Sequence, residues 1–206
     1  MPYSYEYPRP AVTVDTLIFN FDPKIGFEVL LIQRAHEPFK DDWAIPGGFV
    51  DMDEDLLPAA KRELQEETGM SIQNLRELGV FGKPDRDPRG RTITIAYWAL
   101  TAKEDHQLKA ADDAKAYRWF PLDELPSLAF DHDYIINKGI QKLQESAEES
   151  KFLEQLFSTN IDQRLAVKFI KQLFQFIDLR EEIQKLIEES NLDEKSWLNT
   201  FFKKYL

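Results

Sequence analysis

Three glutamates near position 65 are spaced so that their side chains could share one task. Glu63, Glu66 and Glu67 are separated by three and four residues, which places them on one face if the segment is helical. Three carboxylates on one face repel each other, and a bound cation would remove that repulsion. Hard divalent ions prefer oxygen ligands, and Mg²⁺ often binds substrate phosphates as well. The spacing therefore predicts a metal site for phosphate chemistry, with Mg²⁺ as the expected ion and Mn²⁺ as the alternative.

The residues around these glutamates form a longer pattern. From Gly48 to Met70 the sequence is GFVDMDEDLLPAAKRELQEETGM, or G-x5-E-x7-R-E-U-x-E-E-x-G-U with U apolar. From average residue frequencies, a chance match to every fixed position is on the order of 10⁻⁷. Arg62 is spaced to hold the carboxylate of Glu54 or Glu66 by charge-assisted hydrogen bonds. Gly48 lets the backbone approach a metal and offer its carbonyl oxygen. An isolated acidic helix face is usually solvated surface, but this combination favours a functional site.

The segments around the pattern predict strands that would position it. Ala11–Asn20 and Glu28–Gln33 are rich in β-branched and large apolar residues, and the Pro- and Gly-containing segment between them predicts a hairpin. Residues 35–48, with two prolines and a glycine pair, predict a loop. Further on, Arg91–Leu100 predicts a strand and Tyr117–Phe120 a short one. The fold class is therefore α/β.

A helix should carry the glutamates. Small and apolar side chains recur with helical spacing at Leu57, Ala60, Leu64 and Thr68. Asp55 is expected to cap the start of this helix, and Gly69 its end. The helix would therefore project the carboxylates from a rigid element.

The chain changes character after about Asp131. Amphipathic helical patterns follow one another to the end, with no proline after Pro126 and no glycine after Gly139. We therefore expect an α/β domain over residues 1–146 and an all-helical C-terminal extension over residues 147–206. The apolar faces of the extension need burial, which favours a homodimer or packing on the first domain.

A second segment, Phe81–Arg91, is a candidate for substrate binding. Its sequence FGKPDRDPRGR contains three arginines, Arg86, Arg89 and Arg91. Guanidinium groups in one turn can grip phosphate or ribose groups, although a tight turn held by salt bridges explains the same residues. Phe39 and Trp43 precede the glycine pair and are candidates for stacking on a base; a role in the core fits them at least as well.

The glutamate pattern resembles the Nudix box without a substitution, and the flanking strands are similar to the Nudix fold. The resemblance implies an α/β/α sandwich with a mixed sheet, and hydrolysis of a nucleoside diphosphate linked to another group. It also implies metal ligands: Gly48, Glu66, Glu67 and, unless it is the base for the attacking water, Glu63. Arg62 and Glu54 would orient the cluster.

Residues of about 10–145 resemble one branch of that family, which holds ADP-ribose pyrophosphatases and ADP-ribose-sensing regulators of NAD metabolism. The segments QRAHEPFKDDWAIPGGFV, FGKPDRDPRGR and ADDAKAYRWFPLDELPSLAFDH carry the resemblance. It implies a homodimeric enzyme that converts ADP-ribose to AMP and ribose 5-phosphate. His132 belongs to the same pattern, and we expect it to have a structural role at the start of a helix.

Two alternatives stay open: a Nudix hydrolase of a sugar nucleotide, and an ADP-ribose-sensing transcriptional regulator with a C-terminal DNA-binding domain. Residues 147–206 hold nine Lys or Arg against eleven Asp or Glu, and the net charge of the chain is −11. Both values argue against nucleic acid as a partner, because a DNA-binding face is basic. The chain has no cysteine, which excludes thiolate zinc sites, and no apolar run that could cross a bilayer. We expect a cytoplasmic protein with a small-molecule nucleotide substrate and no membrane partner.

Overall fold

A computed structural model of the 206-residue chain describes residues 5–22, 25–101 and 114–148. The chain divides into two compact units, one made of Met1–Phe21 and Glu28–Gly139, the other of Asp22–Phe27 and Ile140–Leu206. Residues 149–206, nearly all of the predicted helical extension, lie outside the described residues, so the extension stays a prediction. No helix among the described residues is long and apolar enough to span a membrane.

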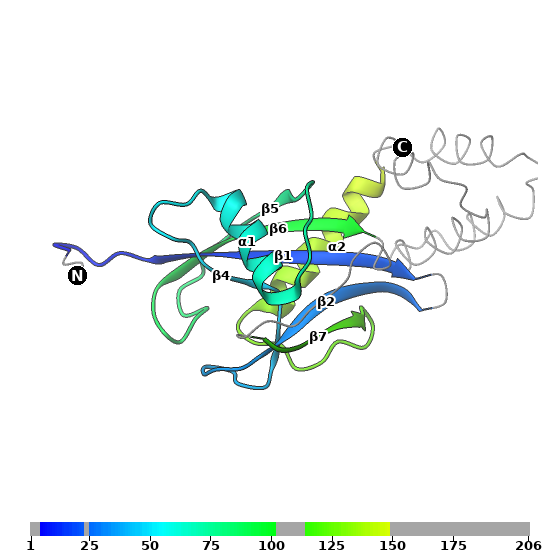
Figure 1. The fold of residues 1–206 in the computed structure, drawn as a ribbon, viewed down its shortest axis with the longest axis horizontal. Helices are drawn as coiled ribbons and strands as arrows, with labels where there is room; N and C mark the ends of the chain where they lie inside the picture. Colours follow the sequence, from blue (N-terminus) through cyan, green and yellow to red (C-terminus); the bar gives the residue numbers. More distant parts are fainter. Residues whose placement is uncertain (1–4, 23–24, 102–113, 149–206) are drawn as a thin grey trace, which may run out of the picture. The chain divides into compact units, whose positions relative to one another are not determined.

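The described residues contain one seven-stranded mixed sheet (Figure 1). Its strands are β1 (Ala11–Asp22), β2 (Gly26–Arg34), β3 (Trp43–Ala44), β4 (Gly47–Phe49), β5 (Arg76–Phe81), β6 (Thr92–Thr101) and β7 (Ala114–Pro121). The main order is β3-β2-β1-β6-β5, with β4 beside β1 and β7 beside β2. β1 and β6 run parallel, whereas β4 with β1, β5 with β6 and β7 with β2 are antiparallel. The sheet confirms the predicted α/β class.

The long strands agree with the sequence prediction, whereas three shorter ones were not predicted. β1 and β2 are neighbours in the sheet, as a hairpin requires, and β6 follows the predicted segment closely. β5 was missed because its side chains are mostly half-buried or exposed, so its apolar pattern is weak. β3 and β4 lie in the segment predicted as a loop, because two or three residues carry no periodicity. They form only by pairing with β2 and β1.

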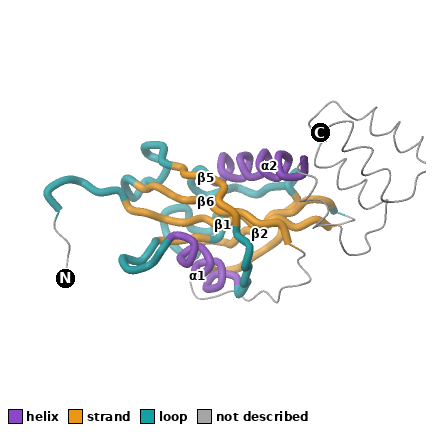
Figure 2. The backbone as a smooth tube through the Cα atoms, turned by 90° about the horizontal axis from the view of Figure 1, so that it is seen from above, coloured by secondary structure: helices purple, strands orange, loops and turns teal. Residues whose placement is uncertain are grey.

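Helices cover both faces of the sheet (Figure 2). They are α1 (Leu56–Thr68) and α2 (His132–Glu148). On one face, Val14 and Ile18 of β1 pack in a buried cluster with Leu64 of α1. The alternate residue Leu17 points to the other face, where it contacts the backbone at Gly139 so closely that a Cβ there would collide. The two-residue period of β1 thus assigns its side chains to the two layers.

The ends of α1 match the predicted caps. Asp55 accepts a hydrogen bond from the backbone N–H of Leu56 at 2.7 Å. Gly69 has φ of 74°, a left-handed conformation that favours glycine, and its N–H donates to the carbonyl of Gln65 at 2.9 Å. The buried face consists of Ala59, Ala60, Leu64 and Thr68, so Ala59 takes the place expected for Leu57, which is partly buried. The helix therefore holds the glutamates at fixed positions.

Candidate active site

Arg62 on α1 organises the acidic cluster. Its Nε and Nη2 donate to both carboxylate oxygens of Glu54 at 2.8–3.2 Å. Its Nη1 donates to Glu63 at 2.8 Å and to Glu66 at 3.0 Å, and Nη2 also donates to the carbonyl of Phe49 at 3.1 Å. The hydrogen bond with Arg62 lowers the pKa of Glu54. One guanidinium therefore joins the backbone at Phe49, the carboxylate of Glu54 and two of the three clustered glutamates.

Glu67 has a different environment. Its Oε2 accepts a hydrogen bond from the backbone N–H of Gly47 at 2.8 Å. The pKa of Glu67 is raised to about 8, chiefly by burial and also by the charges of Glu63 and Asp15, against the opposing effect of the hydrogen bond from Gly47. Burial also raises the pKa of Glu63, against the opposing effect of Arg62. Burial removes water from both carboxylates, and the hydrogen bonds that they make replace it only in part. A bound cation would supply the missing stabilisation.

The glycine pair lets two elements approach more closely than other residues allow. A Cβ at Gly48 would lie 2.5 Å from the carboxylate of Glu63, and one at Gly47 would collide with the backbone of Val14 in β1. Gly48 is paired with Val14 in the sheet. The backbone at Gly48 is therefore held against α1, as expected for a residue that could offer its carbonyl oxygen beside Glu63.

The cluster has the donor chemistry of a site for a hard cation. Carboxylate oxygens of Glu63, Glu66 and Glu67 and the carbonyl of Gly48 are the oxygen ligands that Mg²⁺ prefers. As they stand, however, no three His, Cys, Asp or Glu side chains in the described part of the chain form a group that could hold a metal ion. Arg62 lies between Glu63 and Glu66 and reduces the repulsion between them.

A cleft of about 130 Å³ lies beside the glycine pair. Its charged lining residues are Asp15, Arg34, Arg86, Asp87 and Arg89, and its other side chains include Phe49, Phe130 and His132. Gly47 belongs to the lining as well and donates its N–H to Glu67. The cleft therefore adjoins the glutamate cluster and presents cations, carboxylates and aromatic rings together.

The predicted arginine turn is held by salt bridges and also reaches the cleft. Arg86 is buried and makes a bidentate ion pair with Asp131, at 2.7 and 3.1 Å. Arg89 is bound to Asp87 at 2.7 Å, and its side chain is 41% exposed. Arg91 is exposed, does not line the cleft and donates to the backbone carbonyl of Thr92, the first residue of β6. Two of the three arginines therefore face the cleft, and Arg89 is the more accessible of the two.

The aromatic residues of the cleft differ from those that the sequence suggested. Phe39 packs edge-on against Phe130 at 4.9 Å, and Trp43 packs edge-on against Phe120 at 4.7 Å; neither lines the cleft. Phe49 and Phe130 do line it, with the guanidinium carbon of Arg89 5.1 Å from the first ring and 5.3 Å from the second. Phe49 directly follows the glycine pair, which is a signal that sequence analysis could have used.

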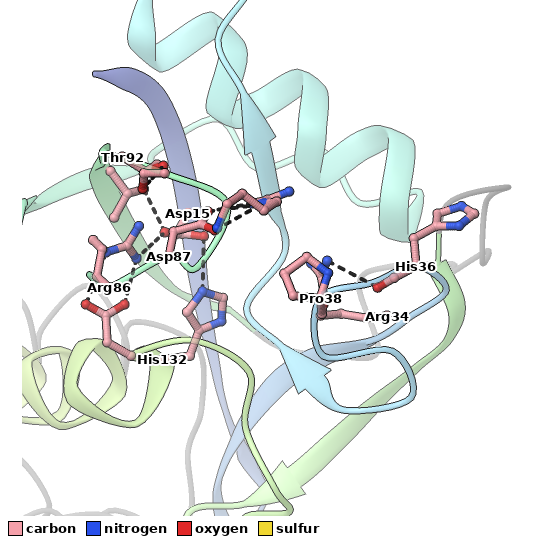
Figure 3. A network of polar contacts seen from close by, with 12 residues as sticks. Asp15, Arg34, His36, Pro38, Arg86, Asp87, Thr92 and His132 are labelled. Carbon is pink, nitrogen blue, oxygen red and sulfur yellow. Dashed lines mark hydrogen bonds and ion pairs between the residues drawn. The ribbon is translucent and has the colours of Figure 1, made fainter. Parts of the chain in front are cut away.

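A buried polar network forms one wall of the cleft (Figure 3). Thr94 donates to Oδ2 of Asp15 at 2.6 Å, and the N–H of Ile45 donates to Nδ1 of His132 at 2.9 Å. Nε2 of His132 lies 3.6 Å from Oδ1 of Asp15, and Nη2 of Arg86 lies 3.8 Å from Oδ2. Asp15 and His132 were not predicted as site residues. A charged residue within the apolar segment Ala11–Asn20 was the signal for Asp15.

Arg34, at the end of β2, is a further lining residue that sequence analysis did not single out. Its Nε donates to the carbonyl of Pro38 at 2.9 Å, and its guanidinium carbon lies 4.8 Å from the ring centre of Phe130. Burial lowers the pKa of Arg34, and the nearby charge of Arg89 lowers it further. Two cations therefore share this part of the cleft, which favours an anionic ligand.

Comparison with known proteins agrees with this arrangement. The profile of the NUDIX domain matches residues 9–139, and the chain belongs to the Nudix family. An ADP-ribose pyrophosphatase from Methanocaldococcus jannaschii is 47% identical over 130 residues, which cover 63% of this chain and 73% of that protein. The resemblance inferred from the glutamate pattern is therefore confirmed.

Two further similarities concern a repressor and a domain bound to ADP ribose. The ADPR responsive transcriptional repressor NtrR of Acinetobacter baylyi is 31% identical over 196 residues, which cover 93% of this chain and 72% of the repressor. The NUDIX domain of Shewanella oneidensis NrtR, solved in complex with ADP ribose, has a TM-score of 0.60 and 30% identity, over 66% of this chain and 90% of that one. Both groups of the predicted branch are thus represented among the relatives.

Proposed function

We propose that this protein is a Mg²⁺-dependent pyrophosphohydrolase that cleaves ADP-ribose to AMP and ribose 5-phosphate. The observation that carries the proposal is the cleft that joins the glutamate cluster of the Nudix box to Arg34 and Arg89. The identity of 47% to an ADP-ribose pyrophosphatase supports the choice of substrate. We further propose that it acts in the cytoplasm as a homodimer.

In this proposal the residues of the box work as one unit. Gly48, Glu63, Glu66 and Glu67 would hold the ion, which would supply electrostatic stabilisation of negative charge on the phosphates. In the overall reaction, water attacks one phosphorus and the bridging P–O bond breaks, which gives AMP and ribose 5-phosphate. Arg62 and Glu54 keep α1 and the glycine loop in register. Glu63 is either a ligand or the base that takes the proton of the attacking water.

The cleft residues bind and orient the substrate. Arg89 and Arg34 offer guanidinium groups to the diphosphate. Phe49 and Phe130, rather than Phe39 and Trp43, offer ring faces to the base because they line the cleft. Arg86 is buried and its Nε and Nη2 are paired with Asp131, so it supports the wall; Arg89 is paired with Asp87 in the same way, but its side chain is 41% exposed and can reach a ligand. Arg91 lies outside the lining and takes no part.

The test is a turnover assay of ADP-ribose with Mg²⁺, beside a panel of sugar nucleotides and dinucleotides. Selective formation of AMP and ribose 5-phosphate from ADP-ribose is the expected result. Faster cleavage of a sugar nucleotide would replace the substrate while keeping the reaction. Omission of the divalent ion should abolish turnover, because the clustered carboxylates then have no shared cation.

A second candidate function is supported by the length of one similarity. The ADP-ribose pyrophosphatase of M. jannaschii aligns with 63% of this chain, whereas the A. baylyi repressor aligns with 93%, which includes most of residues 147–206. This favours an ADP-ribose-responsive regulator whose extension binds DNA, despite the acidic balance of that segment. Binding of ADP-ribose without turnover, together with ADP-ribose-sensitive retention of DNA from the upstream region of its own operon, would establish the regulator.

A further inference from the structure

Two side chains in the wall of the cleft, Asp15 and His132, each have one polar atom that already accepts a hydrogen bond. Oδ2 of Asp15 accepts the hydroxyl of Thr94 and lies near Arg86. Nδ1 of His132 accepts the N–H of Ile45. Because Nδ1 is an acceptor, a neutral His132 carries its proton on Nε2, and burial lowers the pKa of His132 and so keeps it neutral.

The remaining atoms are Oδ1 of Asp15 and Nε2 of His132, which lie 3.6 Å apart (Figure 3). That separation is beyond a direct hydrogen bond. Both residues are buried, with 7% and 4% of their surface exposed, and both line the cleft. Among the described residues no other group completes this pair, so a donor and an acceptor are directed at the same small space.

A hydroxyl group matches this pair. It can accept from Nε2–H and donate to Oδ1 at the same time, at about 2.8 Å from each. A phosphate oxygen cannot donate, and the carboxylate of Asp15 would repel it. Arg34 and Arg89 in the same cleft are cations and favour an anionic group such as a phosphate. The cleft thus separates a place for anions from a place for a neutral hydroxyl.

Building on the proposed function, we propose that Asp15 and His132 form a subsite that binds one sugar hydroxyl of the substrate. The subsite would make the protein select for a ribose that carries this hydroxyl. Thr94 and Arg86 hold Asp15 in place, and Ile45 holds the ring of His132, so both groups are oriented before the ligand arrives.

The test combines a change in the protein with a change in the ligand. His132→Asn keeps an acceptor near the position of Nδ1 for Ile45 and removes the donor at Nε2. Asp15→Asn is a second variant that keeps an acceptor for Thr94. The same substitution at the exposed His36 is the matched control. Each protein is assayed with ADP-ribose and with analogues that lack one hydroxyl, either on the terminal ribose or on the adenosine ribose.

Wild-type protein and His36→Asn should prefer ADP-ribose over one of these analogues by about tenfold or more in kcat/KM. In His132→Asn and Asp15→Asn the preference should fall several-fold, because each variant removes one of the two hydrogen bonds that the hydroxyl makes in the wild-type protein. The analogue that shows the effect identifies which ribose enters the subsite. If ADP-ribose binds without turnover, the same ratios are taken from dissociation constants.

Two results would overturn the subsite while leaving the proposed function intact. Either wild-type protein accepts every analogue as well as ADP-ribose, or the variants lose the same factor on ADP-ribose and on the analogue. The second result would mean that the pair only supports the fold. Failure of the wild-type protein to bind or cleave ADP-ribose would instead overturn the proposed function and the subsite together.

Discussion

The side chains of the acidic cluster differ in their contacts and in their exposure. Arg62 can contact three glutamates and a backbone carbonyl because its donors are fixed in one plane. Glu67 is left with the N–H of Gly47 and a raised pKa. The helical spacing predicted only that the three carboxylates share one face, and the structure shows that their surroundings differ. Glu66 is the exposed one, and Glu67 is the most strongly perturbed.

We expect Glu66→Gln and Glu67→Gln each to lower kcat by about 100-fold or more, because each removes a charged ligand from the proposed metal site. Glutamine keeps the length of the side chain, so the fold should persist. Turnover at saturating Mg²⁺ and thermal unfolding measured on the same samples check both points. A near-wild-type kcat in either variant would remove that residue from the metal ligands.

Arg89→Ala should raise KM by roughly tenfold with little change in kcat, because Arg89 lines the cleft and pairs with Asp87 rather than with a glutamate of the Nudix box. Arg91→Ala is the matched control, since Arg91 belongs to the same turn and does not line the cleft. Steady-state kinetics of the two variants decide the matter. Equal KM values in both would return the arginine turn to a purely structural role.

His132 should make the fold sensitive to acid. Its pKa is lowered by burial, and Arg86 and Arg34 lower it further while Asp15 and Asp131 oppose them. The unfolded chain then binds a proton more readily, so the free energy of unfolding should fall as the pH drops below about 6.5. Urea unfolding between pH 5 and 7.5 should show a smaller loss in His132→Asn than in wild type. Parallel curves would mean that His132 does not titrate in this range.

The two-residue period of β1 and the ends of α1 set the positions of these side chains. Along β1, Val14 and Ile18 face α1 whereas Asp15 and Leu17 face the opposite layer. The same strand therefore supplies the core under the glutamate helix and the carboxylate in the wall of the cleft. The caps of α1 fix where the helix starts and ends, and so where its glutamates lie.

Gly69→Ala should destabilise the fold by about 1–2 kcal/mol, because alanine is strained at a φ of 74°. Gly82→Ala is a suitable control, since a Cβ there would meet its nearest neighbour at an ordinary 3.5 Å. Chemical unfolding of both variants tests the expectation. The same loss in both would mean that the left-handed cap is not responsible.

At the scale of the whole molecule, the chain is acidic and divides into two units. The first unit contains the Nudix fold and the cleft. The sequence of residues 147–206 has amphipathic patterns with large aromatic residues, from which we predict apolar faces that would need burial. Whether those residues serve an enzyme or a DNA-binding regulator is the main difference between the two candidate functions.

Light scattering of the full chain should give twice the single-chain mass of 24.1 kDa, because the apolar faces of the extension require burial. The mass should hold on tenfold dilution if the interface is large. A mass of 24.1 kDa would show a monomer and would place those faces against the chain's own surface.

The spacing of the Nudix box was sufficient to predict the family, the helix with both caps and the class of chemistry, because these depend on residues close together in sequence. The strands with strong apolar patterns were predictable for the same reason. Only the tertiary structure decided that Phe49 and Phe130, not Phe39 and Trp43, line the cleft. It also brought Asp15 within 3.6 Å of His132, which is 117 residues away in the sequence. Contacts of this kind depend on sheet register and helix packing, and no local pattern records them.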